Sequence, residues 1–388
     1  MHKLFSVDDH IIEPEDVWSS RVPTEYRETA PHVIEADGRQ YWAYEDTRAV
    51  TMGLNAVAGL PREQWTREPV RFEDMIPSCY DPVLRAREFR AQGILASVNF
   101  PTLPRFGGAL FNTFRDKTLA DVCVRAWNDF LIEEWCGASP EMFVPMVICQ
   151  LWDPDLAALE IRRCLDKGAK ALCFVENPVG LGLPSFHTEH WDPIFRLCEE
   201  ADLPICMHIG SSGEPAGVTD HETTPSIVRF ASTSFAGAAL STINMMLSPL
   251  PRRFPGIKLV WSEGGIGWVP SAVERADRQY ERHIWSHAAF QDDLLPSDIC
   301  RRNMWFCMVE EPFGIKYRHD VGVSRILWES DFPHADTPYP EVQASASALF
   351  APLPDDERAM IAHANAEALF DFRLVESADG SDHLASLS

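Results

Sequence analysis

The stretch FVPMVICQLWDPDLAALEIRRCLDKGAKALCFVEN, residues 143–177, holds one complete strand–helix–strand unit. Its two ends, Phe143–Cys149 and Ala171–Val175, are continuous apolar runs, which are typical of parallel strands buried on both faces. Between them, Asp153-Pro154 begins a helix that ends at Gly168, because Asp caps free N–H groups and Pro suits the first turn. The stretch therefore predicts two parallel strands joined by a helix, which is the repeating unit of α/β folds.

The same alternation continues in both directions along the chain. Eight strands are expected at Leu4–Val7, Ile94–Phe100, Phe143–Cys149, Ala171–Val175, Ile205–Met207, Lys258–Trp261, Met304–Met308 and Arg325–Trp328. Helices are expected at about 81–91, 119–135, 153–168, from 192 onward, 226–246, 269–285, 339–349 and 355–372. Eight β–α alternations favour a (β/α)8 TIM barrel that forms a single domain, residues 1–372. An open doubly wound sheet is the alternative, but no GxGxxG motif follows any of these strands.

Two segments do not fit a minimal barrel. Residues 19–78 form a long insertion after the first strand, and within it His32–Glu45 predicts a hairpin around Asp37-Gly38, a strong turn signal. We expect this insertion to be a flap over the barrel mouth. The last residues, 373–388, are expected to be a tail, because Ser377–Ser388 are small and polar.

Composition excludes several classes of function. The chain has 388 residues and a formal net charge of −24, and 46% of its residues are hydrophobic. The acidity argues against nucleic-acid binding, which needs a basic face, and against docking on anionic membranes. No apolar run reaches the roughly 18 residues that span a bilayer, and Met1–Ser6 lack the apolar core of a secretory signal. The ten cysteines form no CxxC pair, so we expect buried, reduced thiols in a cytoplasmic protein.

Polar side chains follow the predicted strands, at the end of the barrel where such folds place their chemistry. In Asp8-Asp9-His10, residues 8 and 10 point the same way and Asp9 points away, because side chains alternate along a strand. His208 and Asp331 end the fifth and eighth strands. Two histidines and two carboxylates suit a divalent ion such as Zn, Mn, Fe or Co. The alternative, that these are caps or loop residues, is the one we favour for Asp9, Gln150, Glu310 and Glu311.

Three strings carry a resemblance to a known family: Val7–Pro14 (VDDHIIEP), Met207–Gly210 (MHIG) and Trp328–His334 (WESDFPH). They resemble the amidohydrolase-related (amidohydrolase 2) branch of the amidohydrolase superfamily, over about residues 4–370. That branch includes aminocarboxymuconate-semialdehyde decarboxylase and the γ-resorcylate and 5-carboxyvanillate decarboxylases. The resemblance implies one divalent metal, Zn or Mn before Fe or Co, held by Asp8, His10, His208 and Asp331. It also implies that Asp331 doubles as a proton carrier and that the chain forms a homodimer or higher homo-oligomer.

The sequence departs from the family on three strands. Many members carry His-x-His on the first strand and some decarboxylases Glu-x-His, whereas this chain has Asp8-x-His10. On the sixth strand the decarboxylases carry a histidine where this chain has Glu263-Gly264-Gly265. An anionic Glu263 suits accepting a proton from metal-bound water, or ligating the metal, better than protonating a substrate. Superfamily members with two metals bridge them by a carbamylated Lys or a Glu at the end of the fourth strand. Here Lys170 is at the start of that strand and Glu176 is at its end, and we favour one metal.

Two reactions therefore stay open for a small-molecule carboxylate substrate. The first is non-oxidative decarboxylation of an aromatic or unsaturated carboxylic acid. The second is attack by metal-bound water on an amide, an ester or a C–C bond. A catalytically silent metal- or ligand-binding barrel is a more distant alternative. The residues expected to take part are, for catalysis, Asp331, Glu263 and His208, and, for substrate binding or orientation, Arg105, His334, Glu176 and Trp268.

Overall fold

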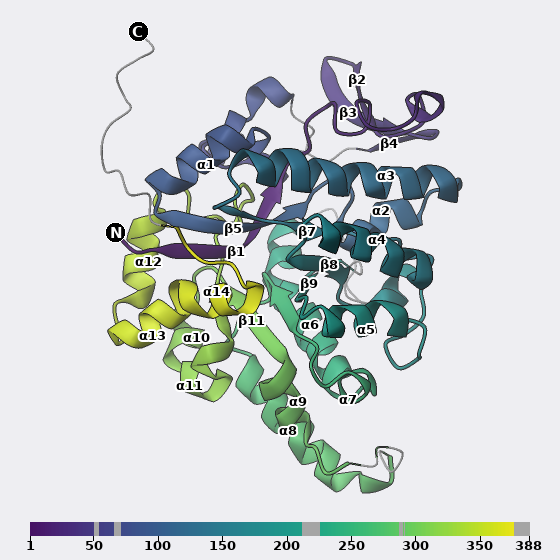
Figure 1. Cartoon of the computed structure of the whole chain (residues 1–388). Coiled ribbons are helices and arrows are strands. Elements are labelled where there is room, and N and C mark those ends of the chain that lie inside the picture. The colour runs from purple at the N-terminus through teal and green to yellow at the C-terminus, as the bar shows by residue number, and fades with distance from the viewer. Residues whose placement is uncertain (50–53, 66–70, 212–225, 287–289, 291, 376–388) are drawn as a thin grey trace.

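The parallel strands close into a barrel inside a ring of helices (Figure 1). The structure is a computed structural model that describes residues 1–49, 54–65, 71–211, 226–286, 290 and 292–375. The barrel strands are β1 (Leu4–Ile11), β5 (Ile94–Pro101), β6 (Phe143–Val144), β7 (Met146–Val147), β8 (Ala171–Val175), β9 (Ile205–His208), β10 (Leu259–Ser262), β11 (Met304–Met308) and β12 (Ile326–Trp328). They pair in chain order, as the apolar runs predict.

The third strand is interrupted at Pro145, which has no N–H to donate. As a result β6 pairs with β5, and β7 pairs with β8. The barrel closes between its last and first strands, where the Asp331 N–H donates to the Asp8 carbonyl (2.8 Å) and the His10 N–H donates to the Phe332 carbonyl (2.6 Å). The (β/α)8 fold expected from the sequence is confirmed, and this closure brings the ends of β1 and β12 together.

The helices cover the outside of the barrel, and most begin where the sequence predicts. Asp81 and Asp153 each cap a helix by accepting two backbone N–H groups. Asp192 was expected to do the same, but it lies inside its helix and pairs with Arg253 (2.6 Å), which takes up its carboxylate. The helices are α1 (Pro82–Ala91), α2 (Ala109–Asn112), α3 (Lys117–Phe130), α4 (Pro154–Asp166), α5 (Asp192–Glu200), α6 (Ser226–Met246), α7 (Leu250–Arg253), α8 (Val269–Arg282), α9 (Pro296–Asn303), α10 (Pro312–Lys316), α11 (Arg318–Val321), α12 (Val342–Phe350), α13 (Asp355–Ala359) and α14 (Asn365–Phe370).

The insertion contains a small antiparallel sheet at one end of the molecule (Figure 1). Its hairpin joins β2 (His32–Ala36) and β3 (Arg39–Tyr44) through Asp37 and Gly38, whose φ angles of 53° and 72° suit a tight hairpin turn. A third strand, β4 (Thr47–Ala49), extends the sheet and was not predicted. Residues 50–53 and 66–70 of the insertion, and 376–388 of the expected tail, lie outside the described residues.

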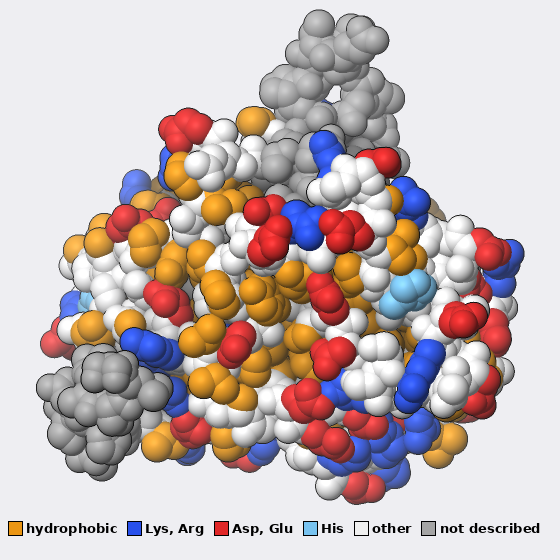
Figure 2. Space-filling model, turned by 90° about the horizontal axis from the view of Figure 1, so that it is seen from above, with side chains coloured by type: hydrophobic (Ala, Val, Ile, Leu, Met, Phe, Trp, Pro, Cys, Tyr) orange, Lys and Arg blue, Asp and Glu red, His pale blue; other side chains and the backbone are white. Residues whose placement is uncertain are grey.

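Most apolar side chains are buried in the core, and some are exposed on the surface. All ten cysteines are buried and unpaired, as their apolar neighbours predict. Figure 2 shows the face that includes α1 and the small sheet, where hydrophobic side chains gather at the centre among charged ones. Within the described part of the chain, no helix is both long and apolar enough to cross a bilayer.

Candidate metal centre

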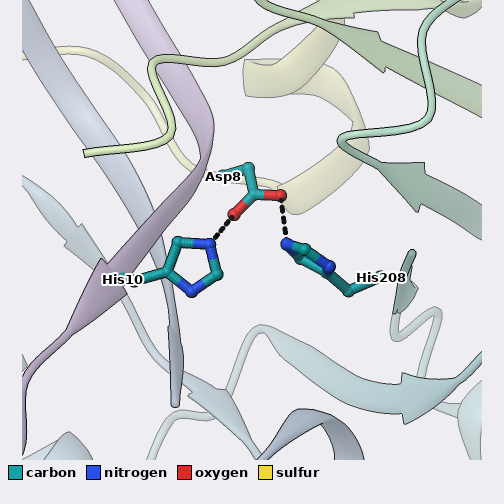
Figure 3. A group of neighbouring side chains, drawn as sticks. All are labelled: Asp8, His10 and His208. Carbon is teal, nitrogen blue, oxygen red and sulfur yellow. Dashed lines mark ion pairs between the residues drawn. The ribbon is translucent and has the colours of Figure 1, made fainter. Parts of the chain in front are cut away.

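Asp8, His10, His208 and Asp331 meet at the carboxyl ends of their strands. Asp8 Oδ1 lies 3.2 Å from His10 Nε2, and Asp8 Oδ2 lies 3.2 Å from His208 Nε2 (Figure 3). Asp331 Oδ1 lies 3.2 Å from the same His10 nitrogen. All four side chains are almost completely buried. Separations of this size are those between neighbouring ligands of one ion, since metal–ligand bonds are about 2.0–2.2 Å long.

The donor atoms of these side chains are buried and have no hydrogen-bond partner. They are both carboxylate oxygens of Asp8, both of Asp331, and the Nε2 atoms of His10 and His208. On its other nitrogen, His208 Nδ1 lies 2.7 Å from the Ile209 carbonyl and donates to it, which leaves Nε2 facing the cluster. Buried polar atoms are normally satisfied, so these unsatisfied atoms fit a divalent cation. The ligand atoms of Asp8, His10 and His208 lie within 4.8 Å of one another, and those of His10, Asp331 and His334 form a second such group that shares His10.

The carboxylates and imidazoles of the cluster shift one another's pKa values. Burial alone would raise the pKa of Asp8, but His208 and His10 lower it overall, so the carboxylate is ionised. Burial opposes ionisation of Asp331 as well, yet His334 and His10 hold its pKa below the ordinary value. Burial lowers the pKa of His208, but Asp8 and Glu263 outweigh it and raise the value to about 9. The negative charge of the carboxylates is therefore the dominant field at this point.

A second layer of buried polar groups holds the strands that carry the ligands. Asp9 points away from the cluster, as predicted, and its carboxylate accepts hydrogen bonds from the Ser97 hydroxyl (2.6 Å), the Ser330 hydroxyl and the Phe332 N–H (3.1 Å). Arg85 is completely buried and donates from Nη2 to the His10 carbonyl (2.9 Å). Burial raises the pKa of Asp9 to about 6, and Arg85 partly offsets this. Asp9 therefore fixes the backbone on both sides of Asp331.

Replacing Asp9 by Ala is expected to destabilise the fold by about 3–5 kcal/mol, because it leaves the buried Arg85 charge and three donors without their partner. Denaturant unfolding of the variant measures this directly. Asp166→Ala, at an exposed position in α4, is the matched control and is expected to change stability by less than about 0.5 kcal/mol. A loss of under 1 kcal/mol in Asp9→Ala would contradict the assigned role.

Aromatic rings pack against both histidines. The Phe106 ring stacks on His208 with centroids 3.7 Å apart and an interplanar angle of 8°. The His334 ring stacks on His10 at 3.6 Å, and His334 Nδ1 lies 3.0 Å from Asp331 Oδ1. His334 thus touches two of the four residues, His10 and Asp331. Phe106 was not predicted, because its position depends on the backbone of residues 105–108.

Glu263 reaches the cluster from the end of β10. Its Oε2 lies 3.3 Å from His208 Nε2, and its backbone has a φ of 57°, which is uncommon for a residue other than glycine. Burial and the charge of Asp331 raise its pKa well above the ordinary value. Both carboxylate oxygens of Glu329 lie 3.2 Å from the Glu263 nitrogen and accept from it. Glu329 is completely buried, and it was not predicted as a site residue.

Two cavities open beside the cluster. The first, of about 350 Å³, is lined by His10, His334 and Phe106 together with Arg105 and Tyr44. The second, of about 610 Å³, is lined by apolar side chains that include Trp268 and by five carboxylates. The five are Glu263, Glu310, Glu311, Glu329 and Asp336, and no Lys or Arg is among its described lining residues. We call the two the arginine cavity and the acidic cavity.

The remaining predicted residues lie in different parts of the site and its surroundings. Arg105 lines the arginine cavity with a backbone φ of 58°. Trp268 lies in the acidic cavity, where its Nε1 donates to the Gly264 carbonyl (2.7 Å) and braces the loop after Glu263. Glu176 is buried at the end of β8, and burial raises its pKa to about 7. Lys170 pairs with Asp371 (3.1 Å) at the opposite end of β8, where the sequence places it.

A family model described as amidohydrolase matches residues 41–372 of the chain. Among curated proteins, a γ-resorcylate decarboxylase from Rhodococcus jostii (strain RHA1) is 24% identical over 349 residues, which cover 84% of this chain and 97% of that protein.

Among solved structures, an amidohydrolase from Mycobacterium avium subsp. paratuberculosis K-10 is similar with a TM-score of 0.72 and 20% identity, over 95% of this chain and 99% of that one. A dihydroxybenzoic acid decarboxylase from Polaromonas sp. JS666, with bound manganese and the inhibitor 2-nitroresorcinol, has a TM-score of 0.60 and 17% identity, over 96% of this chain and 97% of that one. At these identities the structures support the fold alone.

Proposed function

Because this chain belongs to the amidohydrolase family, we propose that it is a metal-dependent carboxy-lyase that removes CO2 from a small aromatic carboxylic acid. The observation that carries the proposal is the buried cluster of unpaired donors on Asp8, His10, His208 and Asp331. The decarboxylase names of its relatives support the choice of reaction. One divalent ion, Mn or Zn, would be held by these four residues, and when bound it would supply a positive charge that draws electron density from the substrate.

The proton that replaces CO2 is assigned to Asp331. Its low pKa means that it is ionised before substrate binds, so it first takes a proton, for which a hydroxyl beside the substrate carboxylate is the natural source. When the carbon–carbon bond breaks, its electron pair stays on the ring carbon, and Asp331 returns the proton to that carbon. His10 and His334 both contact Asp331 and fix the direction of its oxygens. The products are CO2 and the ring with hydrogen in place of the carboxylate; its hydroxyl, left as a phenolate, takes a proton from solvent.

The substrate carboxylate is assigned to the arginine cavity. A volume of about 350 Å³ falls in the range of small-molecule sites, and Arg105 supplies a positive charge. The acidic cavity would repel a carboxylate. Tyr44 and Ala49 of the small sheet also line the arginine cavity, which supports treating residues 19–78 as a flap of the one barrel domain, residues 1–372. Residues 373–388 would be a tail, and the chain would act in the cytoplasm as a homodimer or higher homo-oligomer.

Arg105→Ala is expected to raise the KM for the aromatic acid by at least about 10-fold with a smaller change in kcat, because it removes a charge-assisted hydrogen bond to the carboxylate. The backbone of Arg105, φ 58° and ψ 170°, lies near a region almost reserved for glycine, and such strain is found most often where side-chain placement matters. Steady-state kinetics test this. Arg301→Ala, on the exposed side of α9, serves as the control; an unchanged KM in Arg105→Ala would exclude the assignment.

Hydrolysis is the second candidate, and it is favoured by one observation, the carboxylate of Glu263 beside His208. There, Glu263 or Asp331 would take a proton from water. A panel of hydroxybenzoates that includes γ-resorcylate, given to manganese-loaded protein in H2¹⁸O, separates the reactions. Decarboxylation predicts one CO2 per substrate consumed and no ¹⁸O in the ring product. Incorporation of ¹⁸O by ester or amide substrates without release of CO2 would instead support a hydrolase. A protein that binds metal but turns over neither class would favour a silent barrel.

A further inference from the structure

We propose that Glu263 is a fifth protein donor to the metal ion, held in place by the buried carboxylate of Glu329. This inference rests on the proposed metal-dependent function and goes beyond it, because it replaces the four-residue donor set by one of five. It also implies a coordination number of five or six for the bound ion. Three sets of contacts support it.

The first is the position of Glu263 Oε2 relative to His208. It lies 3.3 Å from His208 Nε2, whereas Asp8 Oδ2 lies 3.2 Å from the same nitrogen. Neither contact satisfies the nitrogen, which has no hydrogen-bond partner although it is buried. Two carboxylate oxygens thus converge on one imidazole nitrogen, and an ion bound at that point would take the nitrogen and both oxygens as ligands.

The second is the backbone that aims Glu263. β10 pairs with β9 so that Ser262 is opposite His208, which puts Glu263 one residue beyond the end of the paired strand. At φ 57° the chain turns there into a left-handed conformation, which costs of order 1–3 kcal/mol for a residue with a side chain. The Glu329 carboxylate offsets this by accepting the Glu263 N–H with both oxygens at 3.2 Å.

The third is the set of contacts that holds the loop after Glu263. Glu311 accepts from the N–H groups of Ile266 (2.5 Å) and Gly267 (2.8 Å). At Gly264 a Cβ atom would lie 2.8 Å from the Ala238 Cβ, so the loop is packed too closely to accept a side chain there. Glu263 is thus held at both ends of its loop. Its side chain is 21% exposed, so it forms the boundary between the cluster and the acidic cavity.

A donor set of three carboxylates and two imidazoles determines which ions fit. Three converging carboxylates repel one another strongly unless a cation lies between them. Five donors exceed the four of the common tetrahedral zinc sites, and carboxylate oxygens favour harder ions. We therefore infer that the site suits a five- or six-coordinate ion such as Mn²⁺, and that Glu263 is occupied as a ligand and does not act as a free base.

The test is a Mn²⁺ titration of chelator-stripped full-length protein, followed by the EPR signal of free and bound Mn²⁺. Glu263→Gln, which keeps the size of the side chain, is expected to raise the Kd for Mn²⁺ by at least about 10-fold and to change the EPR spectrum of the bound ion. Glu329→Gln is expected to raise the Kd by a smaller factor, because it disturbs only the backbone that aims Glu263. Glu310→Gln, in the same acidic cavity, is the control and should leave both readouts unchanged.

Two outcomes would overturn the inference, and they are distinguishable. A Kd and an EPR spectrum of Glu263→Gln equal to those of the unmodified protein would remove Glu263 from the donor set and leave the four-residue centre standing. Failure of the unmodified protein to bind Mn²⁺ or Zn²⁺ would remove the proposed function as well. Should Glu263→Gln lose its thermal transition, Glu263→Asp, which shortens the side chain by one methylene, takes its place with the same expected rise in Kd.

Discussion

Asp331→Asn is expected to lower the turnover of an aromatic acid by at least about 10³-fold. The amide has the size of the carboxylate but can neither take up and return a proton nor bring a negative charge to the metal. Asp331 is completely buried between His10 and His334, and it is the carboxylate to which the proposed reaction assigns the proton. The measurement is the rate of CO2 release at saturating substrate with the metal content of each sample determined.

The fold of Asp331→Asn is expected to survive, because the backbone contacts that close the barrel remain. These are the bonds from the Asp331 N–H to the Asp8 carbonyl and from the His10 N–H to the Phe332 carbonyl. Asp320→Asn, on the exposed surface of α11, is the control. Turnover in Asp331→Asn within about threefold of the unmodified enzyme would remove Asp331 from the reaction.

His208→Ala is expected to lower metal occupancy and thermal stability together. The imidazole supplies one of two nitrogen donors, and its ring is the surface on which Phe106 stacks. A ligand present at 100 times its Kd stabilises the folded state by about 2.7 kcal/mol, so the difference in melting temperature between metal-loaded and chelated protein should largely vanish in the variant. Calorimetry with and without chelator, together with elemental analysis, measures both quantities.

The control for that experiment is His319→Ala, since His319 is 63% exposed and lies beside Glu357 (3.4 Å). It should keep the full metal content and the full stabilisation by metal. Full occupancy in His208→Ala would mean that the ion is held elsewhere, and it would contradict the donor set on which the proposed chemistry depends.

The sequence predicted the strands well because they are buried on both faces. Ala171–Val175 and Met304–Met308 are found at the expected residues, since no polar position interrupts them. β4 (Thr47–Ala49) was missed because Thr-Arg-Ala has no apolar pattern of its own, and it pairs only because β3 presents an edge. Pro145 divides the predicted third strand into β6 and β7, because proline has no backbone N–H to donate.

The candidate ligands could be selected because the strand ends of a barrel converge independently of loop conformation. Strand positions and side-chain alternation were enough to select four candidates: Asp8, His10, His208 and Asp331. The residues that support them could not be predicted, because their places depend on backbone angles. Phe106 reaches His208 through a segment in which Arg105, Gly107 and Gly108 all have positive φ. Glu329 acts on the backbone of Glu263, a contact that no spacing in the sequence encodes.

The most direct test of the account is elemental analysis by mass spectrometry of the full-length protein purified without added metal or chelator. We expect about one divalent transition metal per chain. Absence of metal, even after incubation with Mn²⁺ and Zn²⁺, would contradict the donor assignment. The buried carboxylates of Asp8 and Asp331 would then need another partner, and the chain would be better described as a binding barrel than as an enzyme.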